Sequence, residues 1–196
     1  MRAAAVALLL LAQGAAAAET RLSVPPLDLR AEAAGDRWRI RVLDARGAEV
    51  QRIEVETDAP GQPPLLADAD GDGAPDLWVA TGAGNANLAY EVWRMLPTAG
   101  RFEQAGEIGG IAFARDAGRL VAVGRNGCCA VEYRFLAFGA GMVDQFTISR
   151  RFDPALPPAA ACTSGPEDAD VPRELMSRYC ALGPDSSLPG TRLRVP

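Results

Sequence analysis

Alternation of apolar and polar residues is the dominant pattern along the chain. Two alternating runs, at 38–42 and 52–55, flank a turn at 44–47 and predict a β-hairpin. Further strand-like runs lie at 77–80, 88–94, 118–123, 130–136 and 142–149, separated by clusters of Gly, Pro, Asp and Asn. No stretch before Asp153 keeps helical apolar spacing over three turns. We therefore expect an all-β fold, an antiparallel meander of about eight to ten strands in one propeller-like or barrel-like domain.

The first residues have a different pattern, because one basic residue, Arg2, precedes an apolar run from Ala3 to Ala12 and a stretch of small residues. This is typical of a secretory signal peptide. Its apolar part is about ten residues long, whereas a membrane-spanning helix needs about 20. We expect a signal peptide over residues 1–18, a β domain over 19–152, no membrane span, and a periplasmic or secreted location.

The last part of the chain, residues 153–196, is richer in Pro, Ala, Ser and Asp. Its prolines at 154, 157, 158 and 166 should interrupt any regular strand ladder, which predicts a C-terminal arm and no second domain. Within the arm, the run from Asp170 to Tyr179 predicts a short helix with Asp170 as its cap and Pro172 near the first helical position.

Composition excludes several kinds of chemistry. The chain has no His, and all of its basic residues are Arg. Ser-His-Asp and Cys-His catalysis, histidine zinc sites and lysine Schiff bases are therefore absent. The net charge of −5 makes nucleic acid a poor partner. A carboxylate hydrolase would need two acids in distinct environments facing one cleft. We expect no enzymatic activity.

Four cysteines, an even number in a chain expected to be exported, predict two disulfides. They are Cys128, Cys129, Cys162 and Cys180, and they lack the paired C-x-x-C spacing of a zinc site. A bridge between the two adjacent cysteines would close a strained eight-membered ring. We therefore expect at least one bridge to join the Cys128-Cys129 pair to the C-terminal arm and so tether it.

One segment has the spacing of a calcium loop. The segment runs from Asp68, counted as position 1, to Asp76 at position 9, and acidic residues occupy its positions 1, 3, 5 and 9. Gly73 occupies position 6, and the backbone carbonyl at position 7 adds another oxygen. The glycines Gly71 and Gly73 allow the positive φ angles that a tight loop requires. Strand-like flanks and Val79 at position 12, in place of Glu, distinguish the segment from a helix-loop-helix EF-hand. The alternative is a solvated Asp-Gly turn without metal. The expected calcium ligands are Asp68, Asp70, Asp72, Ala74 and Asp76.

The run Asp-x-Asp-Gly-Asp-Gly-x-x-Asp-Leu, from Asp68 to Leu77, resembles the calcium loop of the FG-GAP and VCBS repeat families. Only one copy is present, which excludes an integrin-like array of blades. From about Leu65 to Phe146 the chain also resembles small exported proteobacterial proteins related to a calcium-binding periplasmic lysozyme inhibitor of Xanthomonas. This resemblance implies a propeller-like domain, bound calcium and a lysozyme as the partner.

In the inhibitor family a Ser-Gly loop that ends in Tyr enters the lysozyme cleft. The nearest match here is Thr81-Gly82 with Tyr90, in which Thr replaces Ser and the spacing to Tyr is longer. The resemblance therefore implies partner contacts at Thr81, Gly82, Asn85 and Tyr90. For Tyr90 the alternative is ordinary strand packing, and Asn85 could simply form the turn.

Three functions stay open, of which a carboxylate hydrolase is the least favoured, because the one tight cluster of acids is better explained by metal ligation. The first is an exported calcium-binding module that binds another protein, such as a lysozyme (muramidase). The alternative is a calcium-stabilised adhesive or glycan-binding domain of the cell envelope, which would favour exposed aromatic side chains.

Overall fold

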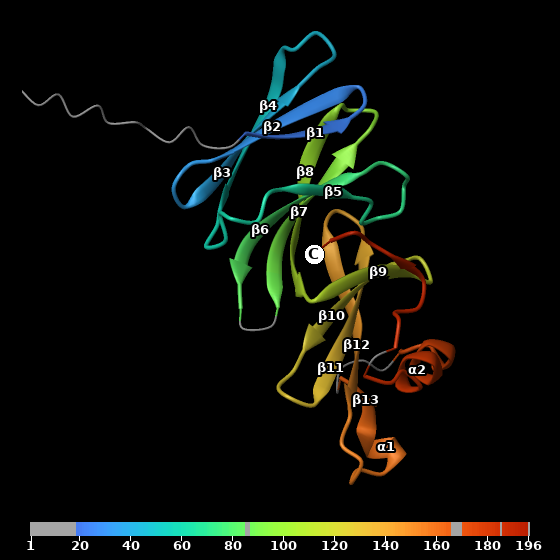
Figure 1. Ribbon diagram of the computed structural model, residues 1–196. Coiled ribbons are helices and arrows are strands. Elements are labelled where there is room, and N and C mark those ends of the chain that lie inside the picture. Colours follow the sequence, from blue (N-terminus) through green and yellow to red (C-terminus); the bar gives the residue numbers. More distant parts are fainter. Residues whose placement is uncertain (1–18, 85–86, 166–169, 185, 196) are drawn as a thin grey trace, which may run out of the picture.

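Three antiparallel sheets follow one another along the chain in the computed structural model, which describes residues 19–84, 87–165, 170–184 and 186–195 (Figure 1). The N-terminal sheet contains β1 (Glu19–Val24), β2 (Leu27–Ala33), β3 (Arg37–Leu43) and β4 (Glu49–Glu56). The central sheet contains β5 (Leu65–Ala67), β6 (Asp76–Ala83), β7 (Leu88–Leu96) and β8 (Arg101–Gly110). In both sheets each strand pairs with the next strand in sequence.

The C-terminal sheet has six strands in the order β13-β12-β11-β10-β9-β14. Its meander consists of β9 (Ala112–Asp116), β10 (Arg119–Arg125), β11 (Ala130–Phe138) and β12 (Met142–Arg151). The arm supplies the two short edge strands, β13 (Cys162–Ser164) and β14 (Thr191–Arg192). Sequence reasoning did not predict these two edge strands, which are only three and two residues long and lie between the prolines of the arm.

The expected all-β antiparallel meander is confirmed, and so is the hairpin at 37–56. The described strands form three separate sheets and no closed barrel, so the barrel-like alternative is wrong. Sequence reasoning overlooked β1, β2, β8 and β9, although Leu27, Leu29 and Ala31 alternate regularly along β2. β8 is less visible because three of its ten residues are Gly.

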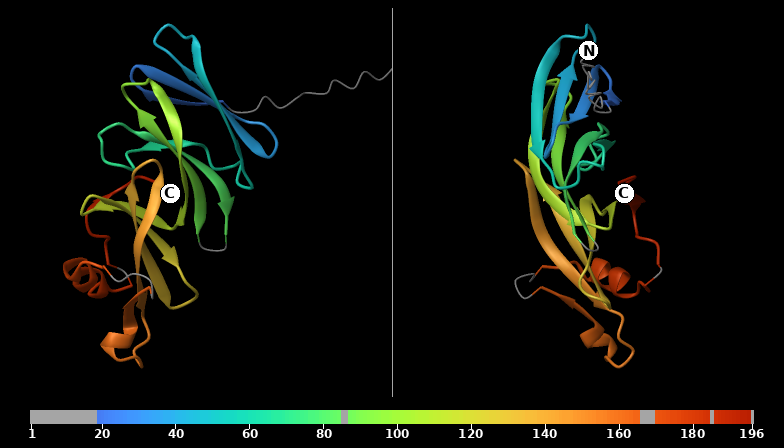
Figure 2. Two further views of the ribbon diagram at one scale, coloured as in Figure 1. Left: turned by 180° about the vertical axis from the view of Figure 1, so that it is seen from behind. Right: turned by 60° about the vertical axis from the view of Figure 1, so that its left-hand side comes forward.

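The central sheet is buried on both faces along β6, where five consecutive residues from Asp76 to Ala80 are inaccessible to solvent. Leu77 and Val79 pack in a core with the N-terminal sheet, and Trp78 and Ala80 pack in a core with the C-terminal sheet. Successive side chains of a strand point to opposite faces, which explains the alternation. Burying one large apolar side chain stabilises the fold by about 1.5–3 kcal/mol. β6 therefore contributes to the cores on both faces of the central sheet, which lies between the other two sheets (Figure 2).

The arm folds back on the C-terminal sheet through α2 (Arg173–Cys180), whereas α1 (Pro158–Ala161) is one short turn. Tyr179 of α2 packs edge-to-face against aromatic rings of β11, and its hydroxyl donates to the buried Asp116 at 3.0 Å. The helix begins at Arg173 with Pro172 as N-cap and no side-chain cap, so the expected capping role of Asp170 is wrong. No helix within the described ranges is long and apolar enough to span a bilayer.

The disulfides differ from the expected tether. Cys128 pairs with its neighbour Cys129 in the turn between β10 and β11, and Cys162 pairs with Cys180 inside the arm. The expected bridge between the Cys128-Cys129 pair and the arm is therefore wrong. The reason is geometric: Cys162 begins β13 and Cys180 ends α2, and both belong to one hydrophobic cluster, whereas the adjacent pair is exposed. Strand pairing and packing attach the arm to the sheet.

Candidate functional site

The predicted calcium loop connects β5 to β6, and Ala67 lies opposite Asp76 in the register of the two strands. The expectation of a strand-flanked loop is thus confirmed. Gly71 and Gly73 have φ angles of 79° and 90°, the left-handed conformation that the sequence predicted for them. A Cβ atom at Gly71 would overlap the guanidinium of Arg115, which would have to move away from its present position.

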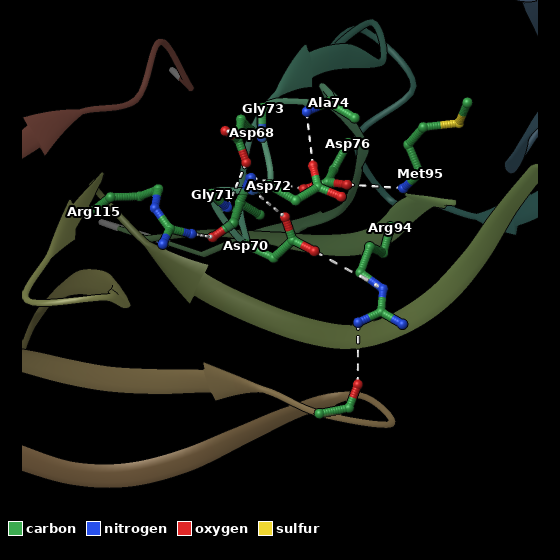
Figure 3. A network of polar contacts seen from close by, with 12 residues as sticks. Asp68, Asp70, Gly71, Asp72, Gly73, Ala74, Asp76, Arg94, Met95 and Arg115 are labelled. Atoms are coloured by element: carbon green, nitrogen blue, oxygen red, sulfur yellow. Dashed lines mark hydrogen bonds and ion pairs between the residues drawn. The ribbon is translucent and has the colours of Figure 1, made fainter. Parts of the chain in front are cut away.

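Three aspartates fold the loop on itself (Figure 3). The two carboxylate oxygens of Asp68 accept hydrogen bonds from the backbone N–H groups of Gly71, at 2.5 Å, and Gly73, at 3.1 Å. Asp70 accepts from the N–H of Asp72 at 3.0 Å, and Asp72 accepts from that of Ala74 at 2.7 Å. Such Asp side-chain bonds to nearby backbone are a standard way of stabilising turns. They leave lone pairs of the carboxylates available to a ligand.

Asp76 differs from the other acids because it is completely buried. Its oxygens accept from the N–H of Ala69 at 2.7 Å and from the N–H of Met95, on β7, at 2.8 Å. Burial raises the pKa of Asp76 to about 7, although these two bonds act in the opposite direction. Near neutral pH the ionised carboxylate is therefore costly without a cation beside it.

The folded loop brings together the carboxylates of Asp68, Asp70 and Asp76, with one oxygen of each within 4.8 Å of the others. Calcium binds oxygens at about 2.3–2.6 Å, so oxygens at this separation fit around one ion. Asp72 is exposed and lies outside this group, and its ligand role and that of the Ala74 carbonyl stay predictions. An all-oxygen donor set suits a hard cation such as calcium.

Electrostatic repulsion acts within this group of acids. Burial raises the pKa of Asp70, and the nearby carboxylates of Asp72 and Asp68 raise it further. The N–H of Asp72 and the guanidinium of Arg94 partly offset this effect. A divalent cation would convert the repulsion among the acids into attraction.

Two arginines link the loop to the C-terminal sheet (Figure 3). Arg115, on β9, donates to the carbonyl oxygen of Ala69 at 2.7 Å. Arg94, on β7, lies 4.0 Å from a carboxylate oxygen of Asp70 and donates to the carbonyl of Gly139, in the β11–β12 turn, at 3.1 Å. Sequence reasoning did not single out either arginine, because nothing in the neighbouring sequence distinguishes them from ordinary surface arginines.

The predicted partner-binding residues differ in where they lie and in how exposed they are. Thr81 and Gly82 are half-buried near the end of β6, at the opposite end of that strand from the aspartate loop. Asn85 lies outside the described residues. Tyr90 is buried, with its ring edge-to-face against Trp78 and Phe113, so strand packing describes its position and its side chain is not at the surface.

The tip of the β6–β7 hairpin is tied to the neighbouring β10–β11 hairpin by Asn87. Its side-chain oxygen accepts from the N–H of Arg125 at 3.0 Å, and its side-chain nitrogen donates to the Arg125 carbonyl at 3.4 Å. This paired contact joins residues 38 positions apart in sequence. Asn87 therefore holds the two tips side by side, a role that its sequence context did not indicate.

No protein-family model matches the chain, and a search of the curated proteins found no match. Among solved structures, the chain is similar to a protein described as "a Xanthomonas Type IV Secretion System related protein". The sequence identity is 13% and the TM-score is 0.46, over 74% of this chain and 86% of the other.

Proposed function

We propose that the protein is an exported, calcium-binding module that binds another protein and has no catalytic role of its own. The observation that carries the calcium assignment is the convergence of Asp68, Asp70 and the buried Asp76 within 4.8 Å. The predicted signal sequence and the disulfides support export, because disulfides persist in oxidising compartments.

The proposed partner is a lysozyme, and the proposed contact surface is the β6–β7 tip at Thr81 and Gly82, with Asn85 as the sequence predicts. From Ala80 to Tyr90 the chain has no acidic residue, so the tip would not be repelled by the two carboxyl groups of a lysozyme cleft. Calcium at the start of β6 and the Asn87 contacts at its end would limit the conformations of the tip. A pre-ordered tip loses little entropy when it docks.

The glycan-binding alternative receives no specific support from the aromatic residues. All three Tyr are buried, as are Trp38 and Trp78, and Trp93 is half-buried against the core of the N-terminal sheet. Sugar rings stack on exposed aromatic faces, which these side chains do not provide. A protein partner therefore fits the described surface better.

Calorimetric titration of the mature protein tests the calcium assignment. We expect one calcium per chain and a rise in melting temperature, since a ligand that binds only the folded state stabilises it, by about 2.7 kcal/mol at one hundred times its Kd. Magnesium is the comparison ion. Absence of both heat and thermal shift at millimolar calcium would contradict the assignment.

A matched pair of variants tests the partner surface in a lysozyme turbidity assay. Ala83→Arg changes an exposed residue at the β6–β7 tip, and Ala45→Arg makes the same change in the exposed β3–β4 turn. We expect the wild type and Ala45→Arg to inhibit at least one lysozyme type and Ala83→Arg to lose at least tenfold in potency. Absence of inhibition of every lysozyme type would exclude this partner, and equal potency of both variants would place the contact elsewhere.

A further inference from the structure

The adjacent cysteines occupy an exposed turn that no part of the proposed function uses. Cys128 and Cys129 lie between β10 and β11, and both are exposed. The other bridge is different, because Cys162 is buried and Cys180 is half-buried in the cluster beneath α2. A solvent-borne thiol can therefore reach the first bridge much more easily than the second.

Stabilisation of the fold does not account for the exposed bridge. A disulfide restricts the unfolded chain mainly by closing a loop, and its effect grows with the length of that loop. Cys128 and Cys129 are neighbours in sequence, so their bridge closes no chain segment. The turn is held by backbone hydrogen bonds, from Asn126 N–H to the Ala130 carbonyl at 3.0 Å and from Phe152 N–H to the Cys129 carbonyl at 2.7 Å. Both are backbone hydrogen bonds and neither involves a sulfur atom.

Two hollows that include Cys128 each have an arginine among their lining residues. One hollow includes both cysteines and Arg151, together with Asn126, Gly127, Ala130, Asp153 and Leu156. The other contains Cys128 and Arg125, together with Ile111, Gly127, Ala130, Val131, Phe152 and Pro184. A guanidinium near a cysteine favours the thiolate, which is the leaving group when a disulfide is attacked.

We propose that Cys128–Cys129 is a thiol–disulfide exchange site for a dithiol protein of the thioredoxin class. A thiolate of the dithiol protein attacks one of the two sulfurs, the bond between them breaks, and the other cysteine leaves as a thiolate that takes up a proton. The second thiol of the dithiol protein then attacks the mixed disulfide and releases the remaining cysteine as a thiol. Two electrons and two protons pass to this chain, and the dithiol protein becomes a disulfide.

The expected consequence is a selective reaction. The exposed bridge should open and close reversibly while Cys162–Cys180 stays oxidised and the fold is retained. The turn lies beside the β6–β7 tip, to which it is joined through the Asn87 contacts with Arg125. Thiol–disulfide exchange at this site requires neither calcium nor a lysozyme, so experiments can contradict it without contradicting the proposed function, and the reverse.

Timed reduction of the oxidised, full mature chain tests this inference. Reduced thioredoxin is added, samples are quenched by alkylation, and peptide mass spectrometry quantifies each bridge. We expect Cys128–Cys129 to be reduced at least tenfold faster than Cys162–Cys180, and the double variant Arg125→Gln, Arg151→Gln to slow the first reaction severalfold. Arg134→Gln, on the same sheet, is the matched control and should leave both rates unchanged.

Trapping of the intermediate provides a second measurement. A thioredoxin variant that lacks its second cysteine should form a mixed disulfide with Cys128 or Cys129, and the double variant Cys128→Ala, Cys129→Ala should form none. Equal reduction rates of the two bridges, or trapping on Cys162 or Cys180 instead, would overturn the proposal. Isolation of the exported protein with Cys128 and Cys129 as permanent free thiols would also overturn it.

Discussion

At the scale of single residues, the four aspartates of the loop have different environments despite their regular spacing. Asp76 is buried at the start of β6, whereas Asp72 is exposed and only caps a turn. Asp70 is half-buried beside Arg94. Ligand strength depends on where each carboxylate lies around the ion, so the four should not contribute equally to calcium binding.

Replacement of one aspartate at a time checks whether the four contribute unequally to calcium binding. Asp70→Ala removes a charged oxygen from the converging group and should weaken calcium binding at least tenfold, about 1.4 kcal/mol. Asp72→Ala, the matched change in the same loop, should weaken binding less, because that carboxylate lies outside the group. Isothermal titration measures both. An equal or larger loss for Asp72→Ala would show that the loop rearranges around the ion.

The pKa of Asp76 gives a pH dependence to the metal-free protein. An unfolded Asp titrates near about 4, whereas burial raises the pKa of Asp76 in the folded protein to about 7. Between these values the folded state holds more protons than the unfolded state. The contribution of Asp76 to stability is therefore fully present below about pH 4, falls as the pH rises through this window, and is lost above about pH 7.

Urea unfolding between pH 4 and pH 8 measures this effect, with Asp76→Asn as the reference because Asn does not titrate. In the presence of chelator, the free energy of unfolding of the wild type should fall relative to that of Asp76→Asn as the pH rises. Bound calcium would stabilise the ionised carboxylate, so the stabilisation by calcium should increase across the same window. A difference that stays constant with pH would contradict the assigned pKa.

At the scale of elements, α2 and β13 form a small unit joined by Cys162–Cys180. The two cysteines are separated by 18 residues, and the bridge is packed against Tyr179 and Leu175. The ion pair between Arg178 and Asp116, at 2.6 Å, attaches this unit to the end of β9. The arm therefore has its own cross-link, and strand pairing, aromatic packing and this ion pair together attach it to the C-terminal sheet.

Removal of each bridge by alanine should have unequal effects on stability. The Cys162→Ala, Cys180→Ala variant should lower the free energy of unfolding by about 3 kcal/mol, the value expected for a loop of this length. The Cys128→Ala, Cys129→Ala variant is the control and should lower it by less than about 1 kcal/mol, since its bridge closes no loop. Chemical denaturation compares them. Similar losses in both variants would contradict the division into a stabilising and an exchangeable bridge.

At the scale of the whole molecule, the aspartate loop lies where the central and C-terminal sheets meet. Arg115 and Arg94 both reach backbone carbonyls across this junction, and Arg115 pairs in register with Thr191 of the arm. Gly190 lies so close to the backbone of Arg115 that a side chain there would collide with it. Order in the loop can therefore be transmitted to β9 and to the arm through Arg115.

Hydrogen exchange with and without calcium checks this transmission. In the wild type, calcium should slow exchange in peptides covering residues 112–116 and 188–195 as well as in the loop. Arg115→Ala removes the donor to the Ala69 carbonyl and should lower stability by about 1–3 kcal/mol. In the Arg115→Ala variant, calcium should slow hydrogen exchange only in the central sheet. Arg134→Ala, an exposed ion-pair partner on β11, is the control and should keep the wild-type response.

Much of the local structure follows from the sequence alone. Alternation of apolar and polar residues predicted β3, β4, β6, β7, β10, β11 and β12, because successive side chains of a strand face opposite sides. The spacing of the acids and the glycines Gly71 and Gly73 predicted a strand-flanked loop with positive φ angles, because these features are local. β1 and β2 also have a local signal, and that signal was overlooked.

Other features depend on contacts between residues distant in sequence, and only the tertiary structure decides them. Pairing of the cysteines depends on which elements fold against each other, and α2 docks beside β13 while the exposed turn lies elsewhere. Burial of Tyr90 requires Phe113, which comes from another sheet. The complete burial of Asp76, which raises its pKa, depends on how β6 packs against other strands, among them β7, whose Met95 N–H donates to the Asp76 carboxylate. Spacing determines which residues can meet, whereas packing determines which of them do.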